Sequence, residues 1–519
     1  MTMHREIELK LEVAPEDAER LRRIPPLASA SHAEQHQHSI YFDTPRRKLQ
    51  KAGFMLRVRQ SGESMVQTVK SAPSGAGLFE RDEWEVPVQA MAPDLDAASR
   101  TPLAKVLTPK LQDQIEQLAA IEVERTTWAV GNGDDRIEVT FDEGEVSTNE
   151  ARRSFNELEL ELKGGSRKAL FGLCEQLGAR VPLRLSVLSK ADRALAIADG
   201  TVDQVKKAQR IDLTEDMSVA EGFTAIVMSC LQHFRWNERI VAKGRDPEAL
   251  HQLRVAMRRL RSAFGLFRPV LRQSRRFRLL SKDLRWASRT LGEARNLDVF
   301  LMLLERRSMD DEQVKRQREE SYDRVVAMLD SPRFLGMMLN LVRWLFIGKW
   351  RERAPSQLPL GSFAARRLQK DWARLAGERS LSKMREKQRH QFRLRTKKFR
   401  YALEFLRSIN PGAKHDAKPF HAALEALQDE LGQLNDMVIA KRLAAAGGIP
   451  ADGLIDEGAR AGMLERIDRR YAELLAIGPY WRPNAPRRPE AAAARRQDAT
   501  KPPAASRRRG PRSAGSAPG

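Results

Sequence analysis

The amino-acid sequence predicts an α+β protein with two folded parts: an antiparallel meander of about eight strands, followed by an all-α helical bundle. In the first 200 residues, apolar and polar side chains alternate with a period of two, which is typical of strands. From about Met217 to Tyr480 the apolar period is 3.6 residues, as in packed helices. From about Arg482 the chain is rich in Pro, Ala, Arg and Ser, and we expect a disordered basic tail.

The expected elements follow one another with glycine-containing turns between several of them. The strands are expected in the segments EIELKLEV, SIYFDT, FMLRVRQ, MVQTVKS, FERDEWEVPV, TTWAV, RIEVTFDEGEV and ELELELK. Helices are expected at residues 15–23, 102–118 and 166–177. We place the domain boundaries at 1–200 for the strand-rich domain, 201–216 for a polar linker, 217–481 for the helical domain and 482–519 for the tail.

Charge restricts the classes of partner. The 519 residues include 91 Lys and Arg against 69 Asp and Glu, which gives a net charge of +22. Such an excess destabilises a compact chain unless a polyanion offsets it, so the expected partner is nucleic acid, polyphosphate or an anionic membrane surface. Net charge alone does not choose among these three.

Further features of the sequence bear on the cellular compartment and on membrane insertion. Cys174 and Cys230 are far apart and match neither a disulfide framework nor a zinc ribbon, so a reducing cytoplasm is the simple interpretation. The first residues are charged, unlike a secretory signal. The most apolar window, residues 334–347, is interrupted by Arg343 and is shorter than the roughly 20 residues that span a bilayer. We therefore expect no membrane segment.

Charged side chains share one face of several expected strands, because residues at alternate positions point to the same side of a sheet. The sets are Glu6, Glu8 and Lys10; Arg57 and Arg59; Arg81, Glu83 and Glu85; and Glu157, Glu159 and Glu161. For any one strand, an ordinary sheet with one face on an apolar core and the other in water explains this pattern. Over several strands, the sorting into acidic and basic sets favours a closed barrel with this face inward and a wet lumen that holds ions of both signs.

These residues form part of a longer series of motifs that resembles the CYTH superfamily, the triphosphate tunnel metalloenzymes. Glu6-Ile7-Glu8-Leu9-Lys10 looks like the Glu-x-Glu-x-Lys signature of that family. Further similarities are Tyr41 to Pro45, Leu56 to Arg59, Thr68 to Lys70, Arg81 to Glu85, Arg125, Phe141 to Gly144, Glu157 to Glu161 and Leu188 to Ala191. One motif alone is weak evidence, whereas their occurrence in order is specific. The resemblance implies an eight-stranded β-barrel tunnel.

The resemblance also implies roles for the charged residues. Arginine and lysine suit phosphate oxygens, so the expected substrate-binding residues are Arg57, Arg59, Lys70, Arg81, Arg125 and Lys190. Carboxylates repel phosphate and are expected to reach it through Mg²⁺ or Mn²⁺, with Glu6, Glu8, Asp142, Glu157, Glu159 and Glu161 as the metal ligands. Lys10, Glu6 and Glu8 are the expected catalytic residues.

The helical half contains an internal duplication. His251, Arg254, Arg258 and Arg261 recur, shifted by 139 residues, as His390, Arg393, Lys397 and Arg400. Each set lies within an arc of about 80° on one helix face. For either helix alone, a solvated basic face is the simpler explanation. The repetition, together with the matching segments Leu291 to Asp298 and Leu431 to Asp436, resembles the CHAD domain and implies that these eight residues bind polyphosphate.

The substrate stays open at this level, because the CYTH superfamily includes inorganic, thiamine, nucleoside and RNA-end triphosphatases and adenylate cyclases. The pairing of the two domains resembles bacterial inorganic triphosphatases and implies hydrolysis of inorganic triphosphate to pyrophosphate and phosphate. The alternatives are a triphosphatase for nucleotides or thiamine triphosphate and a non-catalytic protein that binds or tethers polyphosphate. Nucleic-acid binding rests on net charge alone and is not expected.

Three closely spaced histidines resemble a set of metal ligands. His32, His36 and His38 precede an expected strand in a polar segment without nearby Cys or carboxylate ligands, so we expect a loop or surface role for them.

Overall fold

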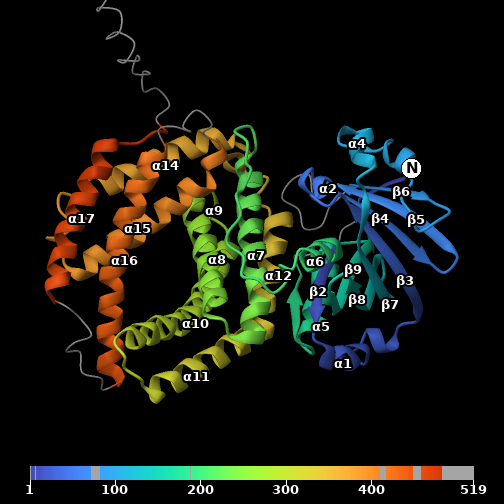
Figure 1. Cartoon of the computed structure of the whole chain (residues 1–519), viewed down its shortest axis with the longest axis horizontal. Helices are drawn as coiled ribbons and strands as arrows, with labels where there is room; N and C mark the ends of the chain where they lie inside the picture. The colour runs from blue at the N-terminus through green and yellow to red at the C-terminus, as the bar shows by residue number, and fades with distance from the viewer. Residues whose placement is uncertain are drawn as a thin grey trace, which may run out of the picture. The chain divides into compact units, whose positions relative to one another are not determined.

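The computed structural model describes residues 2–5, 8–71, 82–186, 189–409, 417–447 and 457–481 (Figure 1). By its internal contacts the chain divides into residues 1–481 and residues 482–519. The tail expected at 482–519 lies outside the described residues.

The N-terminal domain is built on one antiparallel sheet (Figure 1). Its strands are β1 Thr2–Arg5, β2 Glu8–Val13, β3 His32–Asp43, β4 Phe54–Ser61, β5 Ser64–Ser71, β6 Asp82–Pro87, β7 Glu116–Asn132, β8 Asp135–Ser147, β9 Arg152–Gly164 and β10 Leu183–Leu185. Their order is β1-β6-β5-β4-β3-β7-β8-β9-β2-β10. The predicted antiparallel sheet is confirmed.

The N-terminal segment pairs near both ends of this strand order. β1 pairs with β6 and β2 pairs with β9, although only two residues separate β1 from β2 in sequence. The described strands number ten instead of the expected eight, since β1 precedes the first expected strand, which corresponds to β2, and since β10 adds a three-residue edge strand. The N-terminal segment thus lies at one end of the strand order with β1 and next to the other end with β2.

At the β2–β9 pair, the alternation of side chains separates a charged inner face from an apolar outer face. Lys10 on β2 and Glu159 on β9 are register partners, and both line the cavity of the barrel. Leu9 and Leu160 are also register partners, are fully buried and belong to the apolar core. The helix α5, Arg167–Gly178, packs against β9 and begins at Ser166, whose side chain accepts from the Ala169 N–H.

The other short helices of this domain lie between strands, except for the last, which follows β10. They are η1 Pro15–Asp17, α1 Ala18–Arg22, η2 Leu27–Ser29, α2 Lys48–Lys51, α3 Leu95–Ala98, η3 Pro102–Lys105, α4 Pro109–Gln112 and α6 Lys190–Ala198. The prediction of one continuous helix at 102–118 was wrong. Pro109 disfavours helical backbone at the residue before it and begins a new short helix, and the chain is already in β7 from Glu116.

The C-terminal domain is helical, as predicted (Figure 1). Its helices are α7 Val219–Gly244, α8 Pro247–Leu266, α9 Arg268–Leu271, α10 Arg275–Arg306, α11 Glu312–Leu329, α12 Pro332–Ile347, α13 Ala354–Gln357, α14 Leu360–Ala376, α15 Glu386–Phe405, η4 Arg407–Ile409, α16 Ala417–Gly447 and α17 Glu457–Ile477. Within the described residues, no single helix is long and apolar enough to span a bilayer; α11 and α12 meet that test only as a pair bent by 52°.

Each half of the helical domain has its own aromatic cluster. In the first half, Phe223 contacts Phe267 and Trp350 at ring-centroid distances of 5.1 and 5.5 Å. In the second half, Phe420 contacts Trp372 and Trp481 at 5.4 and 5.2 Å. Such pairs stabilise by about 0.5–1.5 kcal/mol beyond the burial of their area. These clusters fix the helices that carry the duplicated basic residues.

Candidate functional site

The barrel encloses a cavity of about 190 Å³. Its lining includes Glu8 and Lys10 from β2, Arg57 and Arg59 from β4, Lys70 from β5, Arg125 from β7, Glu159 and Glu161 from β9, and Lys190 from α6. The structure thus brings together nine of the residues that the sequence nominated. Two others, Glu6 and Arg81, lie outside the described residues.

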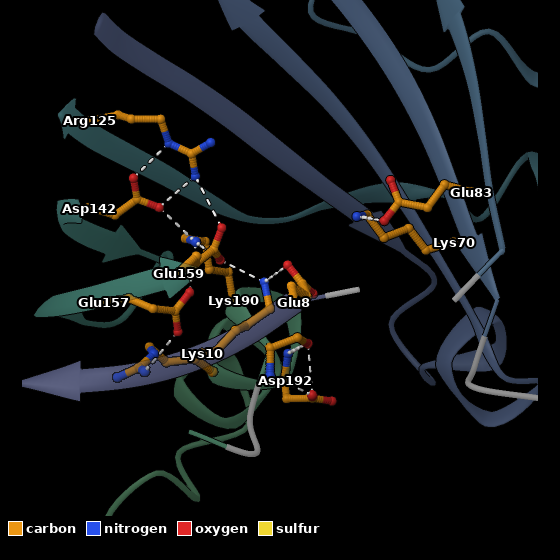
Figure 2. A network of polar contacts seen from close by, with 12 residues as sticks. Glu8, Lys10, Lys70, Glu83, Arg125, Asp142, Glu157, Glu159, Lys190 and Asp192 are labelled. Carbon is orange, nitrogen blue, oxygen red and sulfur yellow. Dashed lines mark hydrogen bonds and ion pairs between the residues drawn. The ribbon is translucent and has the colours of Figure 1, made fainter. Parts of the chain in front are cut away.

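Lys190 is the centre of an acid–base network in this cavity (Figure 2). Its ammonium lies 2.7 Å from Oε1 of both Glu157 and Glu159 and 2.8 Å from Oδ2 of Asp142. Arg125 donates two hydrogen bonds of 2.7 Å to the same Asp142 carboxylate. The capping box of Ser189 fixes the first turn of α6 and so holds Lys190 in place.

The charge state of the network follows from these contacts. Burial lowers the pKa of Lys190, but Asp142, Glu157 and Glu159 raise it well above its usual value. Burial raises the pKa of Glu159, but Lys10, Lys190 and Arg125 bring it well below its usual value. At neutral pH the network is therefore fully ionised at Lys190 and Glu159.

The carboxylates occupy two depths. The side chains of Asp142 and Glu157 are 0% exposed and are not part of the cavity lining, whereas those of Glu8, Glu159 and Glu161 are 18%, 13% and 22% exposed and face it. The outer three offer the hard oxygen donors that Mg²⁺ or Mn²⁺ prefers.

The deeper group has a different environment. Oxygen atoms of Asp142, Glu157 and Glu159 lie within 4.8 Å of one another, which is close enough to share an ion. The ammonium of Lys190 already contacts all three. An ion at that point would have to displace a buried cation, so the outer carboxylates fit a metal better.

The basic wall of the cavity lies on β4 and β5. Arg57 Nη2 donates to Thr68 Oγ1 at 3.1 Å, and Thr68 Oγ1 donates to Glu85 at the same distance. Arg57 Nε is buried and has no hydrogen-bond partner among the described residues. The charge of Arg57, followed by burial, lowers the pKa of Arg59 to about 10. Two close guanidiniums with an orphaned donor are suited to an anionic ligand.

Two groups of functional residues were missed from the sequence. Gln37, Ser39 and Tyr41 of β3 also line the cavity, and their alternate spacing was the available signal. Arg193 of α6 lies 3.7 Å from Glu157 and three residues after Lys190, a spacing that places both cations on one helix face.

The expectation that His32, His36 and His38 precede a strand and lack carboxylate neighbours was wrong. All three lie within β3, which begins at His32. His36 Nδ1 lies 2.7 Å from Glu124 and His38 Nδ1 lies 3.5 Å from Glu122, both on the neighbouring strand β7. These residues alternate with the cavity-lining Gln37 and Ser39, so they occupy the outer surface of the barrel.

The helical domain contains a cavity of about 1360 Å³. Of the eight duplicated residues, His251, Arg254, Arg258, Arg261, His390, Arg393 and Lys397 line it. Arg400 is not part of the lining; its guanidinium lies over the ring of Tyr401, 5.1 Å from the centroid. Further basic residues of the lining are Arg268, Arg278, Arg285, Arg295, Lys387, Arg389, Lys398 and Arg442.

Both repeats contribute to the cavity. The basic faces of α8 and α15 pack beside one another, and each meets an asparagine of its own repeat. Arg254 donates to Asn296 of α10 at 3.3 Å, and His390 lies 3.0 Å from Asn435 of α16. Asp298 is not part of the lining; it is buried and paired with Arg318 at 2.9 Å.

Comparisons with known proteins agree with the two-domain structure. A family model of the CYTH domain matches residues 4–195, and one of the CHAD domain matches residues 225–445. The chain is 29% identical over 195 residues to an inorganic triphosphatase of Haemophilus influenzae, a match that covers 37% of this chain and 54% of that protein. The chain thus spans about half the length of this curated relative.

Two solved structures are also similar. A CHAD domain from the plant Ricinus communis is 31% identical, with 52% of this chain and 94% of that chain covered and a TM-score of 0.42. A putative adenylyl cyclase from Hippeastrum, described as having a dominant triphosphatase activity, is 19% identical, with 36% and 95% covered and a TM-score of 0.28. On the family matches, the chain belongs to the proteins that join an N-terminal CYTH domain to a C-terminal CHAD domain.

Proposed function

We propose that the CYTH domain hydrolyses inorganic triphosphate to pyrophosphate and phosphate with Mg²⁺ or Mn²⁺, and that the CHAD domain binds polyphosphate. The observation that carries this proposal is the meeting of acidic and basic side chains in one barrel cavity. Glu8, Glu159 and Glu161 supply oxygen donors, while Arg57 and Arg59 supply forked cationic donors. A metal-bound triphosphate contains the ions that satisfy both sets.

On the acidic side, Glu8, Glu159 and Glu161 would hold the divalent ion, with Glu6 of the same motif. When bound, the ion supplies Lewis-acid chemistry: it neutralises charge on the phosphoryl oxygens and lowers the pKa of water. We assign Asp142 and Glu157 a supporting role, because they are buried against Lys190. They would fix the Lys190 ammonium that faces the substrate.

On the basic side, Arg57, Arg59, Lys70, Arg125 and Lys190 would orient the phosphates, and the orphaned Nε of Arg57 would gain an acceptor. Burial lowers the pKa of Lys10, but Glu159 and Glu8 raise it above its usual range. We therefore assign Lys10 to stabilising negative charge and not to removing a proton.

Cavity size favours an inorganic substrate. Sites for drug-sized organic molecules usually measure about 300–1,000 Å³, whereas the barrel cavity measures about 190 Å³. Tyr41 is the one aromatic side chain among its described lining residues. A nucleotide or thiamine triphosphate would need room for a ring as well as for its phosphates.

The helical cavity suits a longer anion. Its volume is about 1360 Å³, and most of its charged lining is basic. A chain of phosphates would release counterions as these cations neutralise it, which is the sequence-independent source of affinity in polyanion binding.

The free, buried thiols of Cys174 and Cys230 support a reducing cytoplasm as the compartment.

Product analysis tests the proposed reaction. Phosphorus NMR of the full-length protein with triphosphate and Mg²⁺ should show equal amounts of pyrophosphate and phosphate. Turnover should stop when a chelator removes the metal. Binding of polyphosphate without any product would instead favour the non-catalytic alternative.

A further inference from the structure

Lys397 has an unusual position in the helical cavity. It lies on the inner face of α15, half-buried, with Arg254 and Arg258 of α8 and Arg393 of its own helix as charged neighbours. Among the described residues, no carboxylate lies within ion-pair distance of its ammonium. The acidic groups that act on it are Asp436 and Asp429, both on α16. The local charge is therefore strongly positive.

Several positive charges held close together repel one another, and the repulsion favours loss of a proton from the group that can release it. Arginine keeps its proton near neutral pH, whereas a buried lysine can lose it. Burial, followed by Arg258 and Arg393, lowers the pKa of Lys397 to about 7. Within the described part of the chain, the buried Arg393 Nε also has no hydrogen-bond partner, so this wall offers an unused donor to an anion.

We propose that anion uptake by the helical cavity is coupled to protonation of Lys397, so that the empty cavity holds a partly neutral amine and the loaded cavity holds an ammonium. The proton comes from the solvent and adds to Nζ. This inference rests on the proposed binding of polyphosphate and concerns its regulation. A phosphate chain supplies the negative charge that Lys397 lacks in the empty cavity and so stabilises the ammonium.

The sign of the coupling follows from linkage. The ligand favours the protonated form, so affinity is highest below about pH 7 and falls above it, by up to about tenfold per pH unit. The pKa values of other cavity groups are lowered as well. Burial, followed by Arg295, lowers the pKa of His251, and burial, followed by Arg258, lowers that of Arg254 to about 10. Burial, followed by Arg261, also lowers the pKa of Lys398.

Calorimetry tests this proposal directly. The full-length protein is titrated with long-chain inorganic polyphosphate at pH 8 in two buffers of different ionisation enthalpy, with a chelator present to prevent hydrolysis. The difference in heat gives the number of protons taken up. Lys397→Arg keeps the cation but removes its titration. Lys383→Arg changes an exposed lysine outside the lining and is the matched control, and Lys398→Arg tests the neighbouring amine.

The proposal predicts that proton uptake in Lys397→Arg falls by several tenths of a proton, up to about one, relative to wild type and Lys383→Arg. The steep fall of affinity between pH 7 and 9 should also become shallow in this variant. Lys397→Met, a second variant, should bind more weakly and show the same shallow profile. Equal proton uptake by wild type and Lys397→Arg, or a loss confined to Lys398→Arg, would overturn the inference while polyphosphate binding stands. Absence of binding by the wild type would contradict the proposed function of the cavity and the inference with it.

Discussion

The ammonium of Lys10 lies 2.6 Å from Oε1 of Glu159, across the β2–β9 pair. Glu8, two residues before Lys10, lies 3.1 Å from the same ammonium. A cation thus stands between two of the carboxylates proposed to bind metal. It moderates their repulsion in the empty cavity and remains available to an anionic substrate.

Glu8→Gln should reduce the rate of triphosphate hydrolysis by about 10²-fold or more, because a proposed metal ligand contributes several kcal/mol of charge stabilisation. Phosphate release measures the effect, and thermal unfolding checks that the barrel is intact. Glu122→Gln, on the outer surface, is the matched control and should keep full activity. Normal turnover by a folded Glu8→Gln protein would contradict the proposed role of Glu8.

Asp142→Ala should lower the free energy of unfolding by about 3–5 kcal/mol, since it removes one of the two carboxylates that Arg125 and Lys190 share inside the barrel. Glu161→Gln should change stability by less than about 1 kcal/mol but raise the metal concentration needed for activity. Urea unfolding and a Mg²⁺ titration of the rate distinguish the two roles. An Asp142→Ala protein of wild-type stability with an altered metal requirement would make Asp142 a metal ligand instead.

Stability should depend on pH through the same network. Despite burial, Lys190 and Arg125 lower the pKa of Asp142, and Lys10 and Lys190 lower that of Glu159. The stability contributed by these two groups is present above their unfolded pKa values of about 4 and is lost as the pH falls through the depressed native values. Burial raises the pKa of Glu157 and partly opposes this trend. The unfolding temperature should fall below about pH 4, and less steeply in Asp142→Asn; identical acid slopes would contradict this account.

Arg258→Ala should weaken polyphosphate binding and reduce the slope of log affinity against log salt by about 0.7, the value expected for one lost contact to a single-stranded polyanion. Arg306→Ala removes an exposed arginine outside the cavity and should leave the slope unchanged. Binding measured over a salt series provides both slopes. Equal slopes for wild type and Arg258→Ala would place the polyanion elsewhere.

Most of the fold could be predicted from the sequence, because period-two and 3.6-residue patterns decide between strand and helix. The start of β3 at His32 was missed, since His32 to His38 are largely polar and their pairing with β7 is a long-range property. The helix expected at 102–118 failed at Pro109.

The residues of the candidate site could be predicted from the sequence, but the extent to which each side chain is buried could not. Alternation places Asp142 and Glu159 on the same inner face, yet it does not show that Lys190 covers the first and leaves the second partly exposed. Likewise, the 139-residue repeat identified both basic helices but did not reveal that Arg400, in the last turns of α15, lies beyond the cavity lining. Such differences depend on the helices and strands that pack around each position.

The most direct test of the central claim is phosphate release by the full-length protein from triphosphate, longer polyphosphate, ATP and thiamine triphosphate, each with Mg²⁺ or Mn²⁺. The barrel cavity predicts metal-dependent release that is fastest, by kcat/KM, with inorganic triphosphate. Faster turnover of ATP or thiamine triphosphate, or no release from any of the four, would contradict it.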